Sequence, residues 1–243
     1  MKITTKTIIR ILFTGLIAIP TGTVLAGPIT WDTDSASASC TGGSGNSCTF
    51  TYNSYGLTAR AFATVSNSAT SSFQKATLTV WDGGLGVKSA GESSGSPQHA
   101  LDNNGKKELI VFENNATDYS FTGFGIGWKS NDSDISAWVG SEVAGFDFTG
   151  KKFADLAGLG FTKLDFSNVP TNTTQSLGSL TGNFLILAPN SAADSRSDYV
   201  KISQVSGFIP PPPPPTSISE PGMLALMGIA LVALGACGSR RTV

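Results

Sequence analysis

Charged side chains are scarce in this chain of 243 residues: Asp, Glu, Lys and Arg together make up only 14% of it, against about 25% in an average soluble domain. Long helical bundles and coiled coils need those residues in quantity, so the scarcity excludes both. Glycine is abundant instead, with 28 copies. Short strands joined by polar, glycine-rich turns have this composition, which therefore favours an all-β domain.

Histidine is nearly absent, since His99 is the only one, and there are three cysteines. One histidine and three cysteines are too few ligands for a zinc cluster. A catalytic triad around His99 would use Ser96 and Asp102, but residues so close in an extended loop rarely point at one another, and the sequence has no G-x-S-x-G elbow. We therefore expect His99 and Asn103 to hydrogen-bond the loop backbone, and we expect no enzyme activity.

Basic residues are few in the central part of the chain. Five of the 16 lie in the two end segments: Lys2, Lys6, Arg10, Arg240 and Arg241. All 17 acidic residues lie between Asp32 and Glu220, leaving 11 basic residues against 17 acidic ones and a net charge of −6 for that part. Proteins that bind nucleic acids neutralise phosphates with a stripe of Lys and Arg, so the charge distribution excludes nucleic acid as a partner.

Residues 1–26 have the pattern of a secretory signal peptide. A basic start is followed by the apolar run 11–19, and small residues precede a cleavage site for signal peptidase between Ala26 and Gly27. An N-terminal membrane anchor is the alternative, but the apolar run is shorter than the ~20 residues that a span needs. The segment therefore predicts export.

Export places Cys40 and Cys48 in an oxidising compartment. The spacer between them, TGGSGNS, is rich in glycine and bends easily. Two thiols at this spacing can close a small loop, so the sequence predicts a disulfide between them. A pair of inert free thiols is the alternative.

The C-terminal segment has three parts in a fixed order. Residues 209–218 form a linker that contains six consecutive prolines. As a polyproline II helix, these six prolines would be a stiff spacer of about 19 Å. Residues 223–238 are uncharged and predict a C-terminal transmembrane helix, which would span about 24 Å. Arginine snorkelling and local thinning can close the gap to a ~30 Å hydrocarbon core. Arg240 and Arg241 would hold that end in the cytoplasm.

This tail resembles the PEP-CTERM sorting signal, over residues 219–243. The residues that carry the resemblance are Ser219, Glu220, Pro221, Gly222, Arg240 and Arg241. In that family an exosortase, a multi-pass membrane transpeptidase of Gram-negative bacteria with a catalytic cysteine, cuts near a Pro-Glu-Pro element and releases or re-anchors the exported body. Ser219 stands where the family has its first proline. The resemblance implies an exosortase substrate in the cell envelope or outside the cell; a permanent single-span tail anchor is the alternative.

The central part, residues 27–208, alternates short β-like runs with turns of Gly, Asn, Asp and Ser. Nine runs read as strands: Cys48–Tyr55, Leu57–Ser66, Phe73–Asp82, Glu108–Asn114, Phe121–Lys129, Ile135–Gly140, Phe161–Ser167, Phe184–Ala188 and Tyr199–Phe208. Only residues 151–159 have helical spacing, which predicts one short helix. Nine strands at this spacing predict a single β-sandwich of two sheets, of the jelly-roll type.

A second resemblance covers about residues 81–140. It is carried by the motifs WDGGLGV, SPQHALDNNG, ELIVF, GIGW and DSDIS, in that order. This run is similar to the exosortase-dependent surface proteins, which are exported, β-rich and tailed by a sorting signal. The resemblance implies a cell-surface or extracellular-matrix protein with a non-catalytic structural or adhesive role, and it implies no reaction.

Two loops are rich in oxygen ligands. Asp102 and Asn104 lie in the first, and Asp132 and Asp134 in the second. Calcium takes carboxylate and amide oxygens on flexible loops, so these four residues are weak candidates for a calcium site. The spacing does not fit an EF-hand, and Asx turns use the same residue types.

Carbohydrate binding is the alternative function, with an extracellular polysaccharide as the partner. Jelly-roll sandwiches present aromatic rings to sugars, and the chain has four tryptophans: Trp31, Trp81, Trp128 and Trp138. Buried tryptophan is the commoner case in a sandwich. A glycosidase would need two paired carboxylates. Nothing in the sequence pairs any two of the candidates Glu92, Glu108, Glu113 and Glu142.

Overall fold

The computed structural model describes residues 27–34, 45–52, 55–93, 97, 99–114, 119–190, 196–208 and 227–232. One compact unit spans Ala26–Pro210. Several features predicted from the sequence lie outside the described residues: the signal peptide 1–26 with Ala26, Cys40, Ser96, the linker 209–218, and the sorting residues Ser219, Glu220, Pro221, Gly222, Arg240 and Arg241.

The compact unit is built of strands. They are β1 (Pro28–Asp32), β2 (Ser47–Tyr52), β3 (Tyr55–Thr64), β4 (Phe73–Lys75), β5 (Thr77–Trp81), β6 (Gly84–Lys88), β7 (Leu101–Asp102), β8 (Glu108–Asn114), β9 (Ser120–Asn131), β10 (Ile135–Gly140), β11 (Thr162–Phe166), β12 (Thr174–Ser176), β13 (Phe184–Pro189) and β14 (Asp198–Phe208). A short 3₁₀ helix, η1 (Phe153–Asp155), lies between β10 and β11.

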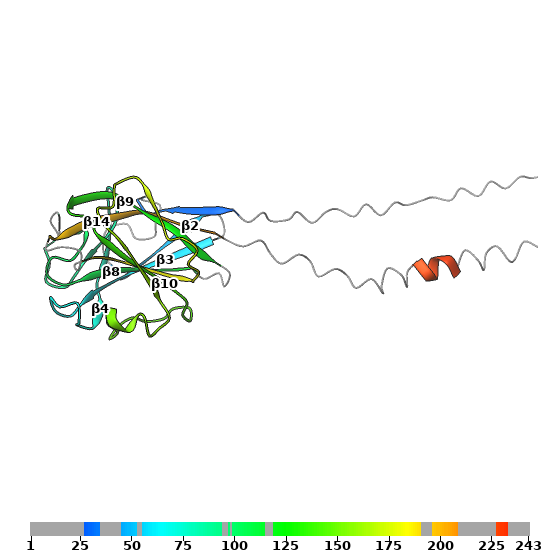
Figure 1. Cartoon of the computed structure of the whole chain (residues 1–243), viewed down its shortest axis with the longest axis horizontal. Helices are drawn as coiled ribbons and strands as arrows, with labels where there is room; N and C mark the ends of the chain where they lie inside the picture. Colours follow the sequence, from blue (N-terminus) through cyan, green and yellow to red (C-terminus); the bar gives the residue numbers. More distant parts are fainter. Residues whose placement is uncertain are drawn as a thin grey trace, which may run out of the picture. The chain divides into compact units, whose positions relative to one another are not determined.

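These strands form two antiparallel sheets. Sheet A has the order β12-β9-β14-β6-β5, with β1 and β7 also paired to β14. Sheet B has the order β11-β10-β13-β8-β3-β2, with β4 paired to β3. Figure 1 shows β9 and β14 in one layer and β3, β8 and β10 in the other. The prediction of a mostly β protein with two sheets and one short helix is confirmed.

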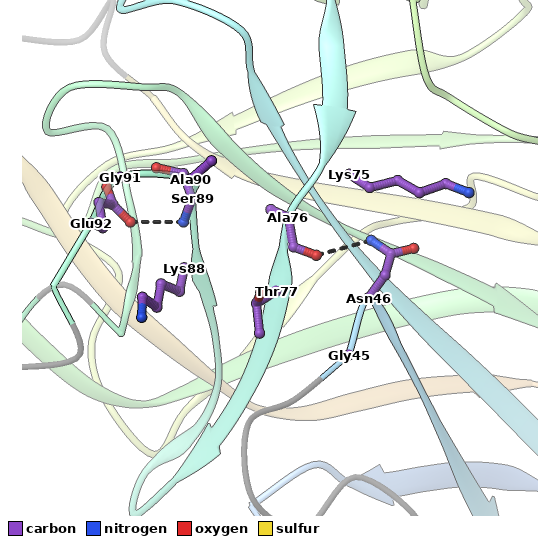
Figure 2. Close-up of a pocket in the computed structure, with 10 residues that line it drawn as sticks. All are labelled: Gly45, Asn46, Lys75, Ala76, Thr77, Lys88, Ser89, Ala90, Gly91 and Glu92. Carbon is purple, nitrogen blue, oxygen red and sulfur yellow. Dashed lines mark hydrogen bonds between the residues drawn. The ribbon is translucent and has the colours of Figure 1, made fainter.

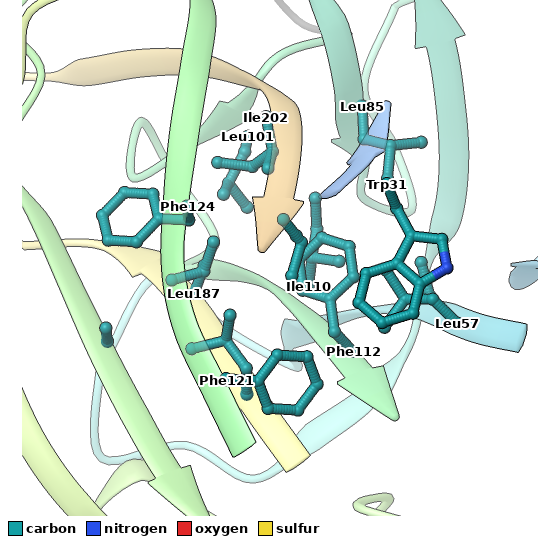
Figure 3. Packing of buried hydrophobic residues seen from close by; sticks show 14 of the residues in the cluster. Trp31, Leu57, Leu85, Leu101, Ile110, Phe112, Phe121, Phe124, Leu187 and Ile202 are labelled. Atoms are coloured by element: carbon teal, nitrogen blue, oxygen red, sulfur yellow. The ribbon is translucent and has the colours of Figure 1, made fainter. Parts of the chain in front are cut away.

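The main core lies between the two sheets. Phe124 and Ile202 come from sheet A, and Ile110 and Leu187 from sheet B; all four are fully buried and meet in the layer that Figure 3 shows. The alternation of buried and exposed residues along β1 and β2 turns one face of each strand into this core. Each large apolar side chain buried here contributes about 1.5–3 kcal/mol.

A second, smaller cluster covers the outer face of sheet B. Residues 141–161 fold over that face and bury Phe148 and Leu156 against Leu109 and Ile186. Because both faces of sheet B are covered, β8 and β13 are buried at every position. Their sequences are accordingly apolar runs rather than alternating ones.

Strand β14 has a hydrogen-bonded neighbour on each edge. It pairs with β9 from Asp198 to Phe208 on one side. On the other side β7, β6 and β1 follow one another along it, and the β1 register joins Pro28 to Phe208. The start of β1 and the end of β14 therefore lie side by side.

Each of the nine predicted strands corresponds to an observed one, although Phe73–Asp82 divides at Ala76 into β4 and β5. The predicted helix over residues 151–159 is η1 followed by turns. Asp155 caps η1 by accepting a hydrogen bond from Lys152 N at 2.9 Å, and Gly160 ends the segment at φ = +84°.

Residues 227–232 are helical and lie within the apolar run 223–238. In the part of the chain that the structure describes, no helix is both long and apolar enough to cross a membrane.

Candidate metal centre

The connection from β9 to β10 carries two acidic residues from sheet A to sheet B. Strand β9 ends at Asn131, whose φ of +62° is accessible to asparagine. Asp132 and Asp134 follow in the three-residue connection before Ile135 opens β10. Asp198 opens β14, which lies beside β9.

The three carboxylates of Asp132, Asp134 and Asp198 form one buried group. One oxygen from each lies within 4.8 Å of the others, and all three residues are buried. We call them the triple-Asp group. Each of the three residues stands where the chain enters or leaves a strand, so the sheets fix their positions.

Asp198 is the best-connected member. Its Oδ1 accepts a hydrogen bond from Asp134 N at 2.7 Å, and its Oδ2 accepts one from Asn103 Nδ2 at 2.6 Å. Asp198 N in turn donates to Asn103 Oδ1 at 2.9 Å. These bonds join the end of β7 to the β9–β10 connection.

The other two members also hold loops in place. Asp134 Oδ1 accepts a hydrogen bond from Asn168 N at 2.6 Å, and Asp132 Oδ1 accepts one from Ser133 N at 2.8 Å. Asp132 Oδ2 lies 3.7 Å from Nη1 of Arg196, whose side chain is mostly exposed. An exposed partner at that distance compensates a buried carboxylate only weakly.

Ionisation of all three carboxyl groups without a bound cation is unfavourable. Burial, and then the charges of Asp134 and Asp132, raise the pKa of Asp198 to about 6, although hydrogen bonds from Asp134 N and Asn103 act in the opposite direction. Clustered carboxylates with little positive charge nearby bind either protons or a cation. The triple-Asp group could hold a metal ion, and an all-oxygen donor set suits a hard divalent cation.

No protein-family model, no curated protein and no solved structure matches this chain. Its function must therefore be inferred from its own residues.

Of the four calcium candidates, the structure brings Asp132 and Asp134 together but leaves Asp102 and Asn104 out of the group. Asp102 pairs with Tyr199 across β7 and β14, and its Oδ1 accepts a hydrogen bond from Asn104 N at 2.8 Å. That bond is an Asx turn, the alternative that the sequence left open.

Sequence reasoning missed Asp198 and the hydrogen bond of Asn103 to its carboxylate. Asp198 lies 64 residues beyond Asp134, so no local spacing joins them. Asn103 was expected to bond the loop backbone. It does bond backbone, at Asp198 N, but its main partner is the Asp198 carboxylate. The sequence feature that could have indicated Asp198 is its position directly before an apolar strand.

The tryptophans divide into buried and exposed ones. Trp31 belongs to the core, 1% exposed, and Trp138 packs on Phe153 in the outer cluster. Trp128 is half-buried beneath the ammonium of Lys201, at 5.1 Å. Trp81 is 52% exposed at the end of β5.

His99 lies next to this exposed tryptophan. Its ring centroid is 5.0 Å from that of Trp81, with the two planes tilted by 39°. His99 O accepts a hydrogen bond from Thr79 Oγ1 at 2.9 Å, which fixes the loop over β5. The imidazole thus supports an aromatic surface residue.

Cys48 is buried on β2 and is disulfide-bonded. Cys40, the partner that the sequence predicts, lies outside the described residues. The loop that such a bond would close therefore stays a prediction.

Proposed function

We propose that the chain is an exported, non-catalytic surface or extracellular-matrix protein, delivered as a substrate of an exosortase-type transpeptidase. The observation that carries the proposal is the order of the C-terminal tail: proline spacer, Ser219 to Gly222, apolar run, then Arg240 and Arg241. The signal-peptide pattern of residues 1–26 supports export by signal peptidase processing. The localisation is then the cell envelope or its exterior, with the tail as a transient or permanent membrane anchor.

The architecture of β14 supports a tethered role. The linker follows directly on Phe208, so β14 is the first strand that a load on the tether reaches. Its hydrogen bonds to β9 on one edge and to β7, β6 and β1 on the other resist that pull in parallel. A strand paired on both edges is a suitable attachment point for a protein held by its C-terminus.

We also propose calcium as the ion of the triple-Asp group. Carboxylates on connections between strands are its usual ligands, and weak sites are filled at extracellular concentrations. The bound ion would join the β9–β10 connection to the start of β14. Asp132, Asp134 and Asp198 would supply one oxygen each, with backbone carbonyls or water as further ligands.

We also propose that the two sheets form a sandwich of the jelly-roll type. Strands β8, β9 and β10 lie alternately in sheets B, A and B, and β12, β13 and β14 in sheets A, B and A. Successive strands that alternate between two packed sheets favour the jelly-roll type.

Peptide mapping of the protein recovered from its own host, with and without the host's exosortase, tests the sorting function. We expect peptides beyond Gly222 to vanish only when the enzyme is present. The variant Glu220→Ala should retain them, whereas the linker variant Ser217→Ala should be processed like the wild type. Persistence of Arg240 and Arg241 in both strains would show that the tail is a permanent span.

A second function, carbohydrate binding, is favoured by one observation. Trp81 exposes half of its surface on a hairpin that is held rigidly: Gly83 N donates to Asp34 Oδ1 at 2.9 Å, and Lys201 Nζ donates to Asp82 O at 2.9 Å. A fixed, exposed indole ring offers an apolar face for a pyranose ring at little entropic cost.

Retention of the full chain on immobilised polysaccharide from its host tests this second function. Trp81→Ala should abolish retention, and Tyr52→Ala, which removes an exposed aromatic ring from β2, should leave it unchanged. Equal retention of both variants would contradict binding at Trp81.

A further inference from the structure

A tight turn follows β6 and holds Glu92 against Ser89. Glu92 N donates to Ser89 O at 3.2 Å, and Ser89 N donates to Glu92 Oε2 at 2.8 Å. Gly91, at φ = +95°, allows the chain to close this turn. Lys106 Nζ donates to Ala90 O at 2.8 Å and fixes the turn from outside.

The turn forms one wall of an open pocket. The pocket has a volume of about 480 Å³ and lies between residues 88–92 and the facing residues Asn46, Ala76 and Thr77. Figure 2 shows the Ser89–Glu92 hydrogen bond at one side, with Lys75 extending away from it on the other. Solvent ions therefore have access to Glu92.

Behind Glu92 lies a second, wholly buried carboxyl group. Glu108 opens β8 with 0% of its surface exposed, and its Oε2 accepts a hydrogen bond from Asp102 N at 3.0 Å. The side chain of Glu108 is within hydrogen-bonding reach of Glu92. Two carboxyl groups, one lining a pocket and one inside the protein, thus meet at the junction of the two sheets.

Two buried oxygen atoms at this place lack a hydrogen-bond partner among the described residues while Glu92 and Glu108 are both ionised. They are Oε1 of Glu108 and Oγ of Ser89. A buried oxygen without a partner destabilises the folded state. In native proteins such atoms commonly mark a bound water or ion. Ser89 N binds the Glu92 carboxylate, so the hydroxyl of the same residue lies close to it. Because Ser89 is not acidic, its buried hydroxyl is an independent sign of a ligand beside Glu92.

Two nearby lysines, Lys106 and Lys107, donate to backbone carbonyl groups. Lys106 binds Ala90 O, and Lys107 Nζ donates to Asn103 O at 2.5 Å. Burial, and then the charges of Asp102 and Glu92, raise the pKa of Glu108 well above its usual value. The acidic groups therefore repel one another across a small buried volume.

We propose that Glu92, Glu108 and the Ser89 hydroxyl form a second divalent-cation site, entered from the pocket and separate from the triple-Asp group. Calcium fits the donor set, since it accepts two carboxylates, a hydroxyl and several waters in flexible geometry. The open pocket supplies the waters. The ion gives both orphaned oxygens a partner and joins the end of β6 to the start of β8.

Calcium titration calorimetry on chelator-treated full-length protein tests this site. The variant Asp134→Asn weakens the triple-Asp group and isolates the remaining binding. In that background we expect one calcium site to persist. Adding Glu108→Gln should abolish it, and adding Ser89→Ala should weaken it by about 10- to 100-fold.

Metal-free stability separates loss of a ligand from loss of the fold. Glu108→Gln keeps the shape and acceptor oxygen of the side chain without its charge, so the metal-free variant should be at least as stable as the wild type. Glu142→Gln, at a residue outside the pocket, should bind calcium like its parent. If the Asp134→Asn protein binds no calcium, the pair holds a proton only and the proposal fails. Binding that survives Glu108→Gln would equally overturn it.

Discussion

Asn103 and Asp198 form a reciprocal pair in which each residue both donates and accepts. Asn103 Nδ2 donates to the Asp198 carboxylate at 2.6 Å, and Asp198 N donates to Asn103 Oδ1 at 2.9 Å. Both residues are buried, so water does not readily replace either hydrogen bond. The pair joins the loop after β7 to the start of β14 and orients one member of the triple-Asp group.

Removal of this asparagine should therefore destabilise the protein. Asn103→Ala leaves a buried N–H and a carboxylate oxygen of Asp198 without their partner, and we expect a loss of about 2–4 kcal/mol in the free energy of unfolding. Urea denaturation measures it. Asn104→Ala, at the exposed neighbour, should cost less than about 0.5 kcal/mol. Equal losses in the two variants would contradict a specific role for the pair.

Calcium should raise the melting temperature of the chelator-treated protein. A ligand that binds only the folded state at 100 times its dissociation constant stabilises it by about 2.7 kcal/mol. Asp134→Asn should reduce this gain, because asparagine keeps the acceptor for Asn168 N but lacks the charge. Asp147→Asn, at an exposed carboxylate, should respond like the wild type. A gain of the same size in the Asp134→Asn protein would show that the ion does not bind at the triple-Asp group.

Acidity should stabilise the metal-free protein. The pKa of Asp102 is raised to about 7, first by burial and then by the charge of Glu92, and that of Asp198 is raised to about 6. Between about pH 4 and pH 7 the folded state therefore holds more protons than the unfolded state. Stability then falls as the pH rises through this window, by up to about 1.4 kcal/mol per pH unit for each group.

Urea midpoints measured with chelator at several pH values check this slope. Asp102→Asn cannot ionise, so its slope should be flatter between about pH 6 and pH 7. A midpoint that rises steadily from pH 4 to pH 7 would contradict the direction of both shifts.

The sequence predicted the long strands because their apolar residues are dense or alternate regularly. It missed β6, whose sequence GLGVK contains two glycines. The turn before it, Asp82-Gly83, joins paired residues Trp81 and Gly84 and is a recognised two-residue hairpin sequence. The sequence therefore contains a signal for the hairpin of β5 and β6.

The candidate sites were less accessible from the sequence, because distant residues build them. Asp132 and Asp134 are neighbours and were found, but Asp198 reaches them only through the pairing of β14 with β9. Glu92 and Glu108 were considered singly, and only the fold brings their side chains together. Pairings of this kind depend on the sheet register, which local spacing does not encode.

A methyl group on Gly86 should displace the loop that carries His99. A Cβ added there would lie 2.0 Å from His99 O and 2.9 Å from the Cα atom of Ala100, so the loop must move. Gly86→Ala should then separate His99 from Trp81 and shift the Trp81 fluorescence, at a cost of about 1–3 kcal/mol. Gly56→Ala, where the added methyl meets nothing within 4 Å, is the control and should leave the emission unchanged.

The buried ion pair between Arg60 and Glu113 should matter more than its exposed counterpart. Arg60 Nη2 lies 2.5 Å from Glu113 Oε2, with the side chains 15% and 4% exposed. Glu113 Oε1 also accepts a hydrogen bond from Gly145 N at 2.7 Å. Arg60→Met leaves the Glu113 carboxylate buried without a counter-ion, so we expect a loss of about 3 kcal/mol in unfolding free energy.

Two further variants show whether that loss comes from the stranded charge. In Arg60→Met/Glu113→Gln the amide is neutral and can still accept from Gly145 N, so the double variant should be more stable than Arg60→Met alone. Lys163→Met breaks an exposed pair with Asp165, whose side chains are 42% and 49% exposed, and should cost less than about 1 kcal/mol. If Arg60→Met costs no more than Lys163→Met, the Glu113 carboxylate is hydrated in solution, and the ion pair between β3 and β8 contributes little to stability.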